Sequence, residues 1–318
     1  MHPFSKNPQA CAGNLGECKL LEHIHDWLGE STPPSPYGMG DDTAVLQQSG
    51  NLLTTDSLVY NKHFDDGAHP EAVGYKLLAR NLSDIASMGG TPLHAVTAFF
   101  MPANTSLEWL EGFTRGLGAC AQAYGVKIVG GDLTGTDGFL GATLTLDGIA
   151  ERPLLRGRVK AGDLLYVTGN LGGSISGKHL NFIPRLKEGR QLARYKAVSG
   201  CMDITDGLGK DLPGFLSKGL AAQIDLNALP ISEAAREQSG RDGRSIEEHA
   251  FCDGEDYELL FSVEPTFAEQ LEGEWKSSDL TPIRRIGVAV EQNGSMVLMD
   301  RAGNPLPHWH GYEHLGKS

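Results

Sequence analysis

Aspartate residues recur in this chain at the ends of apolar segments and in glycine-containing turns, as in GMGDD, TTDS, NLSD, VGGDL and MDITDG. The candidate ligands, with two threonines that stand beside one of the carboxylates, are Asp41, Asp42, Thr54, Thr55, Asp56, Asp84, Asp132, Asp203 and Asp206. Such oxygen donors suit Mg²⁺ or Ca²⁺. Two carboxylates about 4 Å apart repel by about 4 kcal/mol at an effective dielectric near 20. If the fold brings these acids together, divalent cations would remove that cost, and the cleft would suit an anion that arrives with Mg²⁺, such as ATP.

Each carboxylate also has a structural interpretation. Asp42 is compatible with a turn, and Asp56 with the end of a strand. Asp206 has the position of an N-cap for a following helix. Asp84 follows Arg80 by four residues, which is the spacing of a surface ion pair on a helix. Taken singly, such residues are more often structural than catalytic, so the argument for a metal site depends on the whole set.

The segment GGSISGKH, from Gly172 to His179, resembles a phosphate-binding P-loop, because it has the pattern G-x-x-x-x-G-K and follows the apolar segment LLYVTG. A P-loop places a serine or threonine hydroxyl on Mg²⁺ directly after its lysine. Here Lys178 is followed by His179, and imidazole suits a hard cation poorly. Pro184 would also break the helix that such a loop must begin. We therefore favour an ordinary strand-to-helix turn, with a P-loop as the alternative.

The chain has 318 residues, 41 glycines, 40% hydrophobic residues and a formal net charge of −13. This length allows two domains, and the acidic balance argues against a nucleic-acid partner. The first residues lack the pattern of a signal peptide. The apolar run AVTAFFMP is too short to span a membrane. Five cysteines without a C-x-x-C pair indicate a reduced, cytoplasmic protein, although Cys11 and Cys18 remain candidates for a metal site.

Hydrophobic periodicity predicts alternating helices and strands in the first half of the chain. Thr105 and Glu108 have the spacing of a capping box for the last of the helices, which should end at Tyr124. Pro70 suits the first turn of an earlier helix, and Gly89 suits the position just after it. The expected helices cover residues 16–29, 69–90 and 105–124; the expected strands cover 43–48, 51–59, 92–102, 126–133 and 139–151, and we expect 92–102 to be buried.

The same alternation returns in the second half. The expected strands cover residues 164–169, 221–226, 257–263 and 284–290; the expected helices cover 207–219, 231–240 and 264–275, with Pro213 bending or delaying the first. Pro153, Gly157 and Gly162 interrupt the pattern between the halves. We place the domains at residues 1–152 and 153–318. Mixed strands and helices in both halves predict two layered α/β units rather than one barrel.

Seven motifs in order along the chain resemble those of thiamine-monophosphate kinases, which belong to the superfamily of aminoimidazole ribonucleotide synthetase and selenophosphate synthetase. The motifs are GMGDDTAVL, TTDSLVYNKHF, AVGYKLLARNLSDIASMGG, VGGDLTGT, MDITDGLGKDL, GEDYELLF and GYEHL. They extend over nearly the whole chain, and the match of the ordered set is far more specific than that of any one motif.

The resemblance implies a two-domain aminoimidazole ribonucleotide synthetase-like fold. The N-terminal domain would form a homodimer by joining its sheet to that of a second copy, and the C-terminal α/β sandwich domain would complete the site. The implied reaction transfers a phosphoryl group from ATP to thiamine phosphate, giving thiamine diphosphate, with several Mg²⁺ ions. The acceptor phosphate has a second pKa near 6 and needs no strong general base.

Residue roles carry over from the family by position. The carboxylates and threonines named at the outset match metal ligands, with Asp41 a weaker candidate; of these, Asp42, Asp84, Asp132 and Asp206 are the expected catalytic residues. The positions that match contacts to ATP are Gly131, Asp132, Arg156 and Thr205. The positions that match contacts to thiamine phosphate are His63, Glu255 and Tyr312.

The sequence also departs from the family pattern. Asp253 stands where the family has glycine, Thr205 replaces a serine, and the segment between Gly177 and Pro184 is shorter than usual. Two alternatives stay open. One is another ATP-dependent kinase or synthetase of the same superfamily, and the other is a non-catalytic relative that binds Mg²⁺ and nucleotide.

Overall fold

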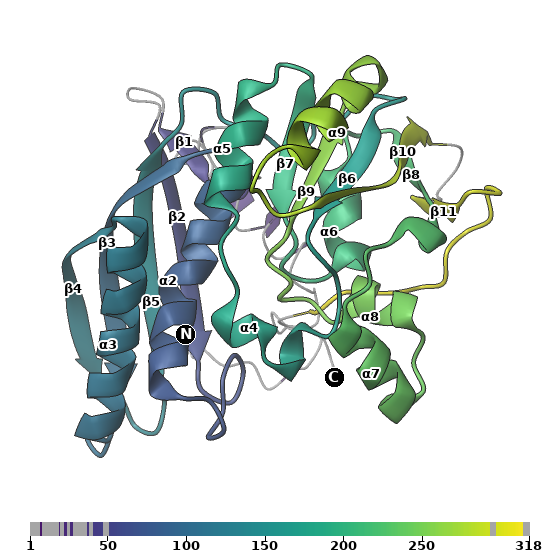
Figure 1. The fold of residues 1–318 in the computed structure, drawn as a ribbon. Helices are drawn as coiled ribbons and strands as arrows, with labels where there is room; N and C mark the ends of the chain where they lie inside the picture. The colour runs from purple at the N-terminus through teal and green to yellow at the C-terminus, as the bar shows by residue number, and fades with distance from the viewer. Residues whose placement is uncertain are drawn as a thin grey trace.

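The computed structural model of the chain describes residues 7, 19, 22–23, 26–27, 37, 41–46, 51–292 and 297–313. These residues form two β-sheets that lie side by side, each covered by helices (Figure 1). The expected α/β class with two layered units is therefore confirmed. Cys11, Cys18 and most of the helix expected at 16–29 lie outside the described residues.

The first sheet has the order β1-β2-β5-β3-β4, and the strand expected at 51–59 has the predicted bounds. Its strands are β1 (Ala44–Leu46), β2 (Asn51–Val59), β5 (Gly141–Ile149), β3 (Thr91–Met101) and β4 (Lys127–Gly135). All neighbours are antiparallel except β3 and β4, which are parallel. Helices α2 (Pro70–Ser87) and α3 (Leu107–Tyr124) cover one face of this sheet (Figure 1).

Among the residues that the structure describes, no helix covers the other face of the first sheet, and strand β2 shows the resulting alternation. Leu52 and Leu58 are buried under the helices, whereas Leu53 and Thr55 on the opposite face are exposed. Residues 92–102 were expected to form a buried strand, and this was wrong: β3 is only half-buried, and Val96 is exposed. The pattern of an apolar strand could not reveal that no described helix covers the second face.

Helix α2 begins at Pro70, and Gly89 follows its end in a left-handed conformation, with φ of 69°. Both features confirm the expected helix, since proline fits the first turn and glycine tolerates positive φ. The capping box expected for α3 was wrong by one residue. Ser106 is the N-cap, and its hydroxyl accepts a hydrogen bond from the Trp109 amide, whereas the Thr105 hydroxyl donates to the Pro102 carbonyl.

The second sheet has the order β11-β8-β10-β6-β9-β7. Its strands are β6 (Leu164–Thr168), β7 (Val198–Asp203), β8 (Leu220–Ile224), β9 (Leu259–Val263), β10 (Ile283–Glu291) and β11 (Leu298–Asp300). Its helices are α4 (Lys178–Asn181), α5 (Leu186–Arg194), α6 (Leu208–Phe215), α7 (Glu233–Asp242), α8 (Ile246–Cys252) and α9 (Ala268–Lys276). In β6, Tyr166 packs into one hydrophobic cluster and Leu165 and Val167 into another, so this strand is buried on both faces.

The periodicity did not predict β7, β11, α5 or α8. Gly200 in β7 and Gly189 in α5 weaken the local pattern, because glycine lowers the propensity for both structures. Pro213 lies inside α6 rather than ending it. Proline has no amide to donate to the carbonyl of Gly209, four residues earlier, and the helix continues only to Phe215.

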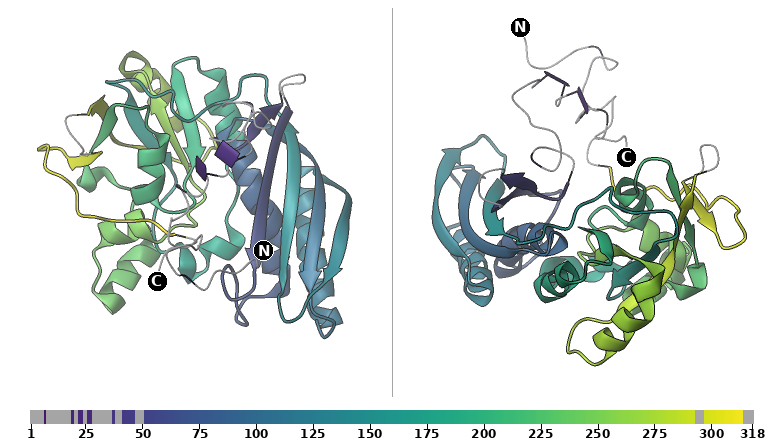
Figure 2. Two further views of the ribbon diagram at one scale, coloured as in Figure 1. Left: turned by 180° about the vertical axis from the view of Figure 1, so that it is seen from behind. Right: turned by 90° about the horizontal axis from the view of Figure 1, so that it is seen from above.

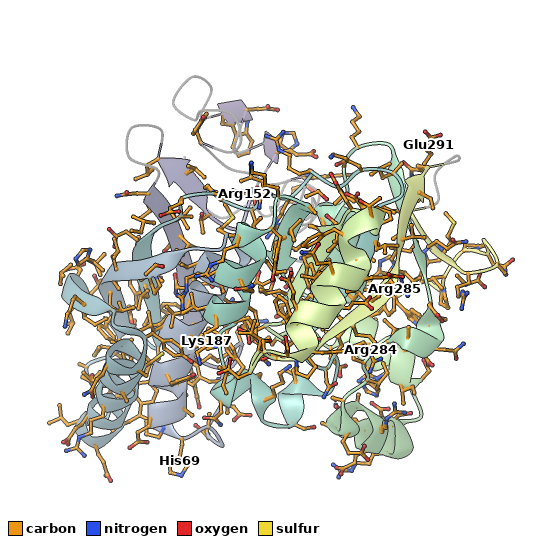
Figure 3. All side chains as sticks on the ribbon, turned by 45° about the horizontal axis from the view of Figure 1, so that its top comes forward. His69, Arg152, Lys187, Arg284, Arg285 and Glu291 are labelled. Carbon is orange, nitrogen blue, oxygen red and sulfur yellow. The ribbon has the colours of Figure 1, made fainter. Side chains whose placement is uncertain are left out.

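Helices α2 and α5 pack together between the two sheets, as the right-hand view of Figure 2 shows. Gly189 of α5 permits this approach, because an added Cβ would overlap the carbonyl oxygen of Ala86 in α2. Arg152, labelled in Figure 3, fastens the connection between the sheets. Its guanidinium donates hydrogen bonds to the carbonyls of Ala193, Tyr195 and Val198. The contact between the halves therefore has both an apolar and a polar component.

Within the part of the chain that the structure describes, every helix is too short or too polar to cross a lipid bilayer.

Candidate active site

A cleft with a volume of about 300 Å³ opens where the two halves meet. Both halves line it: α2 and the β2 strand from the first, and the ends of β7 and the 253–257 segment from the second. The predicted site residues that line it are Asp41, Asp42, Asp56, His63, Asp84, Arg156, Asp203, Thr205, Asp206, Glu255 and Tyr312. A larger cavity of about 620 Å³, beside Trp275 and Arg285, is lined by none of the predicted residues. The cleft between the halves is therefore the candidate active site.

Three carboxylates meet at one end of the cleft. Asp42, Asp84 and Asp203 each place an oxygen within 4.8 Å of the others. The Thr54 hydroxyl, in β2, donates a hydrogen bond to Asp84 at 2.5 Å. The Ser83 hydroxyl, in α2, donates to Asp203 at 2.6 Å. Since Asp203 ends β7 and Asp84 belongs to α2, the cluster joins the two halves of the molecule.

The carboxylates at this end of the cleft are crowded and shielded from water. Burial, followed by the Asp56 and Asp203 carboxylates, raises the pKa of Asp84 well above its ordinary value. Burial raises the pKa of Asp203 to about 6 although Ser83 donates to it, and burial raises that of Asp41 to about 6 against the opposing Arg156 charge. Desolvation and like charges both disfavour the ionised form. A bound cation would reverse this balance.

The donor set fits Mg²⁺. Asp42 Oδ2 is buried and has no hydrogen-bond partner among the described residues, so a buried acceptor is left over at the point where the three carboxylates converge. The donors there are oxygens only, which is the preference of hard divalent cations. A buried acceptor without a partner costs free energy, and a metal ion would supply the missing interaction.

Arg156 closes this end of the cleft from the segment between the sheets. Its guanidinium pairs with Asp42, and its amide donates to Asp41 at 3.0 Å. The guanidinium is partly exposed, with 30% of the side chain accessible. Arg156 is therefore placed to contact an anion that enters the cleft beside the carboxylates.

Two cations on α2 were not predicted as site residues. Arg80 pairs with Asp56 at 3.2 Å and donates to the Ser57 carbonyl at 2.7 Å. Lys76, fully buried, pairs with Glu255 at 2.8 Å. The surface ion pair between Arg80 and Asp84 considered from the sequence was wrong, because Arg80 points into the cleft.

The signal for these cations was present in the spacing. Lys76, Arg80 and Asp84 follow one another at intervals of four residues, which places them on one face of a helix. The intervening residues Leu77, Leu78, Ala79 and Leu82 are buried. Because buried charges need partners, charged residues along one face of a helix that is buried on nearly all sides are expected to pair with groups of opposite charge.

Glu255 and His63 lie at the other end of the cleft. Burial alone would raise the pKa of Glu255, but the Lys76 ammonium and, further away, Arg80 lower it below its ordinary value. Lys76 also donates to the His63 carbonyl at 3.0 Å, and the His63 ring accepts from the Val59 amide at 3.0 Å. One buried lysine thus contacts two of the three predicted thiamine-phosphate contacts, His63 and Glu255.

Glu255 and Tyr257 have φ of 52° and 50°, in the left-handed region that side chains other than glycine rarely occupy. Their amides donate to the carbonyls of Thr205 and Ile204, at 2.6 Å and 2.9 Å, so the strained segment is fixed to the end of β7. The Tyr257 hydroxyl donates to Glu255 at 3.2 Å. Strain of this kind concentrates at functional sites.

Thr205, Asp206 and Tyr312 line the wall that the second half contributes. Asp211, buried behind them, accepts hydrogen bonds from the amides of Thr205 and Asp206 at 2.8 Å and 2.9 Å. The Tyr312 amide donates to the Asp206 carbonyl. The helix cap considered for Asp206 was wrong: Gly207 is the N-cap of α6, and Asp206 pairs with Lys210 at 2.8 Å.

Some predicted residues do not line the cleft. Thr54 lies behind Asp84, and Thr55 donates to the Leu144 carbonyl. Gly131 and Asp132 lie on β4, where every residue is exposed. The register pairs Asp132 with Ala98, Ala98 with Thr143 and Thr143 with Ser57. Three strand spacings, about 14 Å, therefore separate Asp132 from β2, and within one chain Asp132 stays apart from the other carboxylates.

The structure also decides between the interpretations of GGSISGKH. Ser174–Ser176 form a 3₁₀ turn, and the following helix α4 has only four residues. It ends at Asn181, shortly before Pro184. Lys178 pairs with the buried Glu258 at 2.8 Å and donates to the Asn170 carbonyl. The lysine is thus used inside the second half, which supports the strand-to-helix turn and not the P-loop.

Comparisons with known proteins agree with this architecture. Residues 40–150 match the family model described as AIR synthase related protein, N-terminal domain, and residues 177–300 match its C-terminal domain. A thiamine-monophosphate kinase of Rhodopirellula baltica is 37% identical over 275 residues, which cover 82% of this chain and 86% of the relative. One of Haemophilus influenzae is 31% identical over 333 residues, covering 96% and 99%.

Solved structures show the same relationship. A structure described as AaThiL complexed with AMPPCP and TMP superposes with a TM-score of 0.82 at 26% identity, covering 97% of this chain and all of that one. Thiamine monophosphate kinase from Aquifex aeolicus gives a TM-score of 0.75 at 25% identity, with coverage of 90% and 97%. From its domains and its relatives, the chain belongs to the thiamine-monophosphate kinase family.

Proposed function

We propose that the protein is a thiamine-phosphate kinase, which transfers the γ-phosphoryl group of ATP to thiamine phosphate and releases ADP and thiamine diphosphate. The convergence of Asp42, Asp84 and Asp203 from both halves of the chain carries this proposal. The relatives' names support it, as does the similar structure in complex with TMP and AMPPCP, which is an analogue of ATP. The domain boundary near residue 152 and the cytoplasmic location remain predictions.

The two ends of the cleft would hold the two substrates. Arg156 and Thr205 lie beside the carboxylate cluster and would contact the phosphates of ATP. Glu255 and His63 lie further along the cleft beside Lys76, and Tyr312 adjoins Asp206; these three residues would contact thiamine phosphate. The Glu255 carboxylate, kept ionised by Lys76, complements the cationic thiazolium ring.

Asp42, Asp84 and Asp203 would hold Mg²⁺, which neutralises phosphate charge and aligns two anions when it is bound. The chain's own residues hold the reactants in place. Arg156 adds a fixed charge beside the carboxylates. Thr54 and Ser83 fix the orientation of Asp84 and Asp203 through their hydroxyls. An oxygen of the acceptor phosphate attacks the γ-phosphorus in line, and the bond to the ADP oxygen breaks, so no side chain has to remove a proton.

We further propose that the protein is a homodimer and that Asp132 reaches the cleft of a second copy. The first sheet supports this, because its bare face and the edge strand β4 expose Leu53, Val96, Val129 and Leu133. An exposed apolar edge strand is a template for pairing with another chain. The distance of Asp132 from its own cleft also favours a role in a neighbouring one.

Turnover of thiamine phosphate by the purified protein tests the function. With ATP and Mg²⁺, thiamine diphosphate should accumulate, and chelation with EDTA should stop it. Production of ADP without thiamine diphosphate would contradict the assigned acceptor. No turnover, together with binding of ATP and Mg²⁺ by calorimetry, would favour the non-catalytic alternative.

Mixing two inactive variants tests the dimer. A heterodimer of Asp84→Asn and Asp132→Asn would contain one cleft with both residues intact, provided that Asp132 acts in the neighbouring copy. Subunit exchange between the two variants should therefore restore activity. Without restoration in a mixture shown to contain heterodimers, Asp132 would have to act within its own chain or not at all.

A further inference from the structure

The turn Gly172–Gly177 is held by carboxylates of its own chain. The Gly172 amide donates to Asp256 at 2.9 Å, and the Gly173 amide donates to Asp253 at 2.8 Å. Gly173 has φ of 70°, and Gly172 has φ of 79°. Successive amides of residues in such conformations form a concave site for anions. The turn that resembles a phosphate-binding loop therefore uses its amides to bind side-chain carboxylates of the second half.

Asp253 is the centre of a buried polar cluster. Only 4% of its side chain is exposed. Besides the Gly173 amide, its carboxylate contacts Nδ1 of the buried His249 at 2.9 Å and Arg244 at 3.4 Å. Its backbone is right-handed, with φ of −67°, so the position does not need glycine; Gly254, with φ of 69°, makes the left-handed step instead. Asp253 thus contacts His249 of α8 and Arg244 of the preceding loop, and it also accepts the hydrogen bond from the turn.

The turn reaches the cleft through Ile175. This side chain is 52% exposed and lines the cleft, and the hydroxyl of the preceding Ser174 donates to the carbonyl of Gly254, next to Glu255. An exposed apolar side chain in an otherwise charged cleft is suited to contact the organic part of a ligand. Gly172 and Gly173 cannot fix the turn by side-chain packing, so its position depends on its hydrogen bonds.

We infer that Asp253 is a positioning residue for the acceptor: by fixing the Gly173 amide, it holds Ile175 against the ring system of thiamine phosphate. This inference rests on the proposed function for the identity of the acceptor, but the effect on the turn itself does not. Asp253 borders the cleft two residues before Glu255, and its side chain contacts Gly173, His249 and Arg244 rather than Asp42, Asp84 or Asp203. Its loss should therefore weaken binding of the acceptor and leave ATP and the chemical step nearly unchanged.

The experiment compares Asp253→Ala and Asp253→Asn with the wild-type protein. A charge-assisted hydrogen bond contributes about 1.5–3 kcal/mol, so for Asp253→Ala we expect KM for thiamine phosphate to rise about tenfold or more. KM for ATP and kcat should stay within about twofold. Asparagine keeps an oxygen for the Gly173 amide, so Asp253→Asn should recover most of the lost affinity. Ile175→Ala should raise the same KM without changing the turn.

Hydrogen exchange of the ligand-free protein supplies a readout that does not depend on activity. The amides of residues 172–177 should exchange faster in Asp253→Ala and near the wild-type rate in Ile175→Ala. Asp242→Asn is the matched control: Asp242 contacts His249 and Arg244 but not the turn, and this variant should leave both KM and exchange unchanged.

The outcomes separate the two proposals. Faster exchange of the turn without a change in KM for thiamine phosphate would overturn the positioning role. Equal losses in kcat and in both KM values would mean that Asp253 supports the whole second half, and would overturn it too. If the wild-type protein does not turn over thiamine phosphate, the proposed function fails, while exchange still shows whether Asp253 holds the turn; unchanged exchange in Asp253→Ala would refute that.

Discussion

Two groups of acidic side chains in and near the cleft differ in what they face. Asp42, Asp84 and Asp203 face one another, and one of their buried oxygens has no partner among the described residues. In the second group, Asp253 accepts from an amide and contacts a histidine and an arginine. Glu258 is paired with Lys178 and Arg185. We call the first group open, because it can still accept a cation, and the second group closed, because donors of the protein already pair with its carboxylates.

The difference shows that residue type alone does not define a metal ligand. A buried carboxylate with enough donors stabilises the surrounding backbone, whereas a group of carboxylates without them stores repulsion that a cation can relieve. Substitutions should therefore have opposite consequences in the two groups. In the open group they should reduce kcat and spare stability; in the closed group they should spare kcat, and removal of the fully paired Glu258 should reduce stability.

The largest effect should come from Asp84→Asn. Loss of a carboxylate shared by the cluster should lower kcat at least a thousandfold, which is about 4 kcal/mol of transition-state stabilisation. Because the substitution also removes repulsion, the free energy of unfolding of the metal-free protein should hold or rise by about 1 kcal/mol. Steady-state kinetics and urea denaturation measure the two quantities.

Asp279→Asn, which removes an exposed carboxylate, controls for the change in net charge and should alter neither quantity. Full activity in Asp84→Asn would remove this residue from the site. A large loss of stability would mean that Asp84 belongs with the closed group.

Glu258→Ala should show the reverse pattern. The side chain is only 1% exposed and accepts hydrogen bonds from Arg185, Lys178 and Thr168. Removing one partner of a buried ion pair costs about 3–5 kcal/mol, because the remaining charges lose their compensation. Urea denaturation should show this loss, while kcat of the folded protein should remain within a few fold. A stable but inactive variant would contradict the structural role.

Asp256→Asn should change how stability depends on pH. Burial raises the pKa of Asp256 to about 7. A carboxyl group with a raised pKa in the folded state stays protonated after the unfolded chain has ionised, so it lowers stability as the pH rises from about 4 to about 7. Asparagine removes this dependence, so relative to wild type it should stabilise the protein by roughly 4 kcal/mol more at pH 8 than at pH 4.

Denaturation of wild type and Asp256→Asn between pH 4 and pH 8 measures this difference. The two curves should diverge as the pH increases. Parallel curves would show that Asp256 has an ordinary pKa in the folded protein.

The smallest effect should come from Thr54→Val, which keeps the shape of the side chain but removes the hydrogen bond to Asp84. Groups that orient metal ligands typically contribute about 10–100-fold to metal affinity, and we expect the low end because Asp84 keeps its place in α2. The concentration of Mg²⁺ at half-maximal rate should rise about tenfold. Thr97→Val, at a buried threonine of β3, is the matched control; equal shifts in both variants would disprove the specific role of Thr54.

Much of this architecture could be predicted from the sequence. The bounds of β2 followed from the alternation of apolar and polar residues. Pro70 indicated where α2 begins, and Gly89 indicated that it ends shortly before. The ordered motifs predicted the family. Asp42, Asp84 and Asp203, which the motifs had identified as candidate metal ligands, form one cluster in the structure. Local patterns predict such elements because side-chain periodicity and turn residues are local properties.

The rest depends on contacts between distant segments. No local pattern indicates that Lys76 contacts Glu255, 179 residues later, or that the Gly173 amide binds Asp253. Likewise, the order of strands in the sheet, not the spacing in the chain, separates Asp132 from the cleft. The predicted N-cap of α3 was wrong by one residue, because Thr105 and Ser106 are adjacent and both residue types suit an N-cap.

Binding of Mn²⁺, counted by electron paramagnetic resonance in the presence of a non-hydrolysable ATP analogue, tests the shared site most directly. Asp84→Asn and Asp203→Asn, one from each half of the chain, should each lose ion binding relative to wild type. The double variant should lose no more than either single variant, because both carboxylates hold the same ion. Undiminished binding in both single variants, or additive losses of separate ions, would contradict a metal centre built jointly by the two halves.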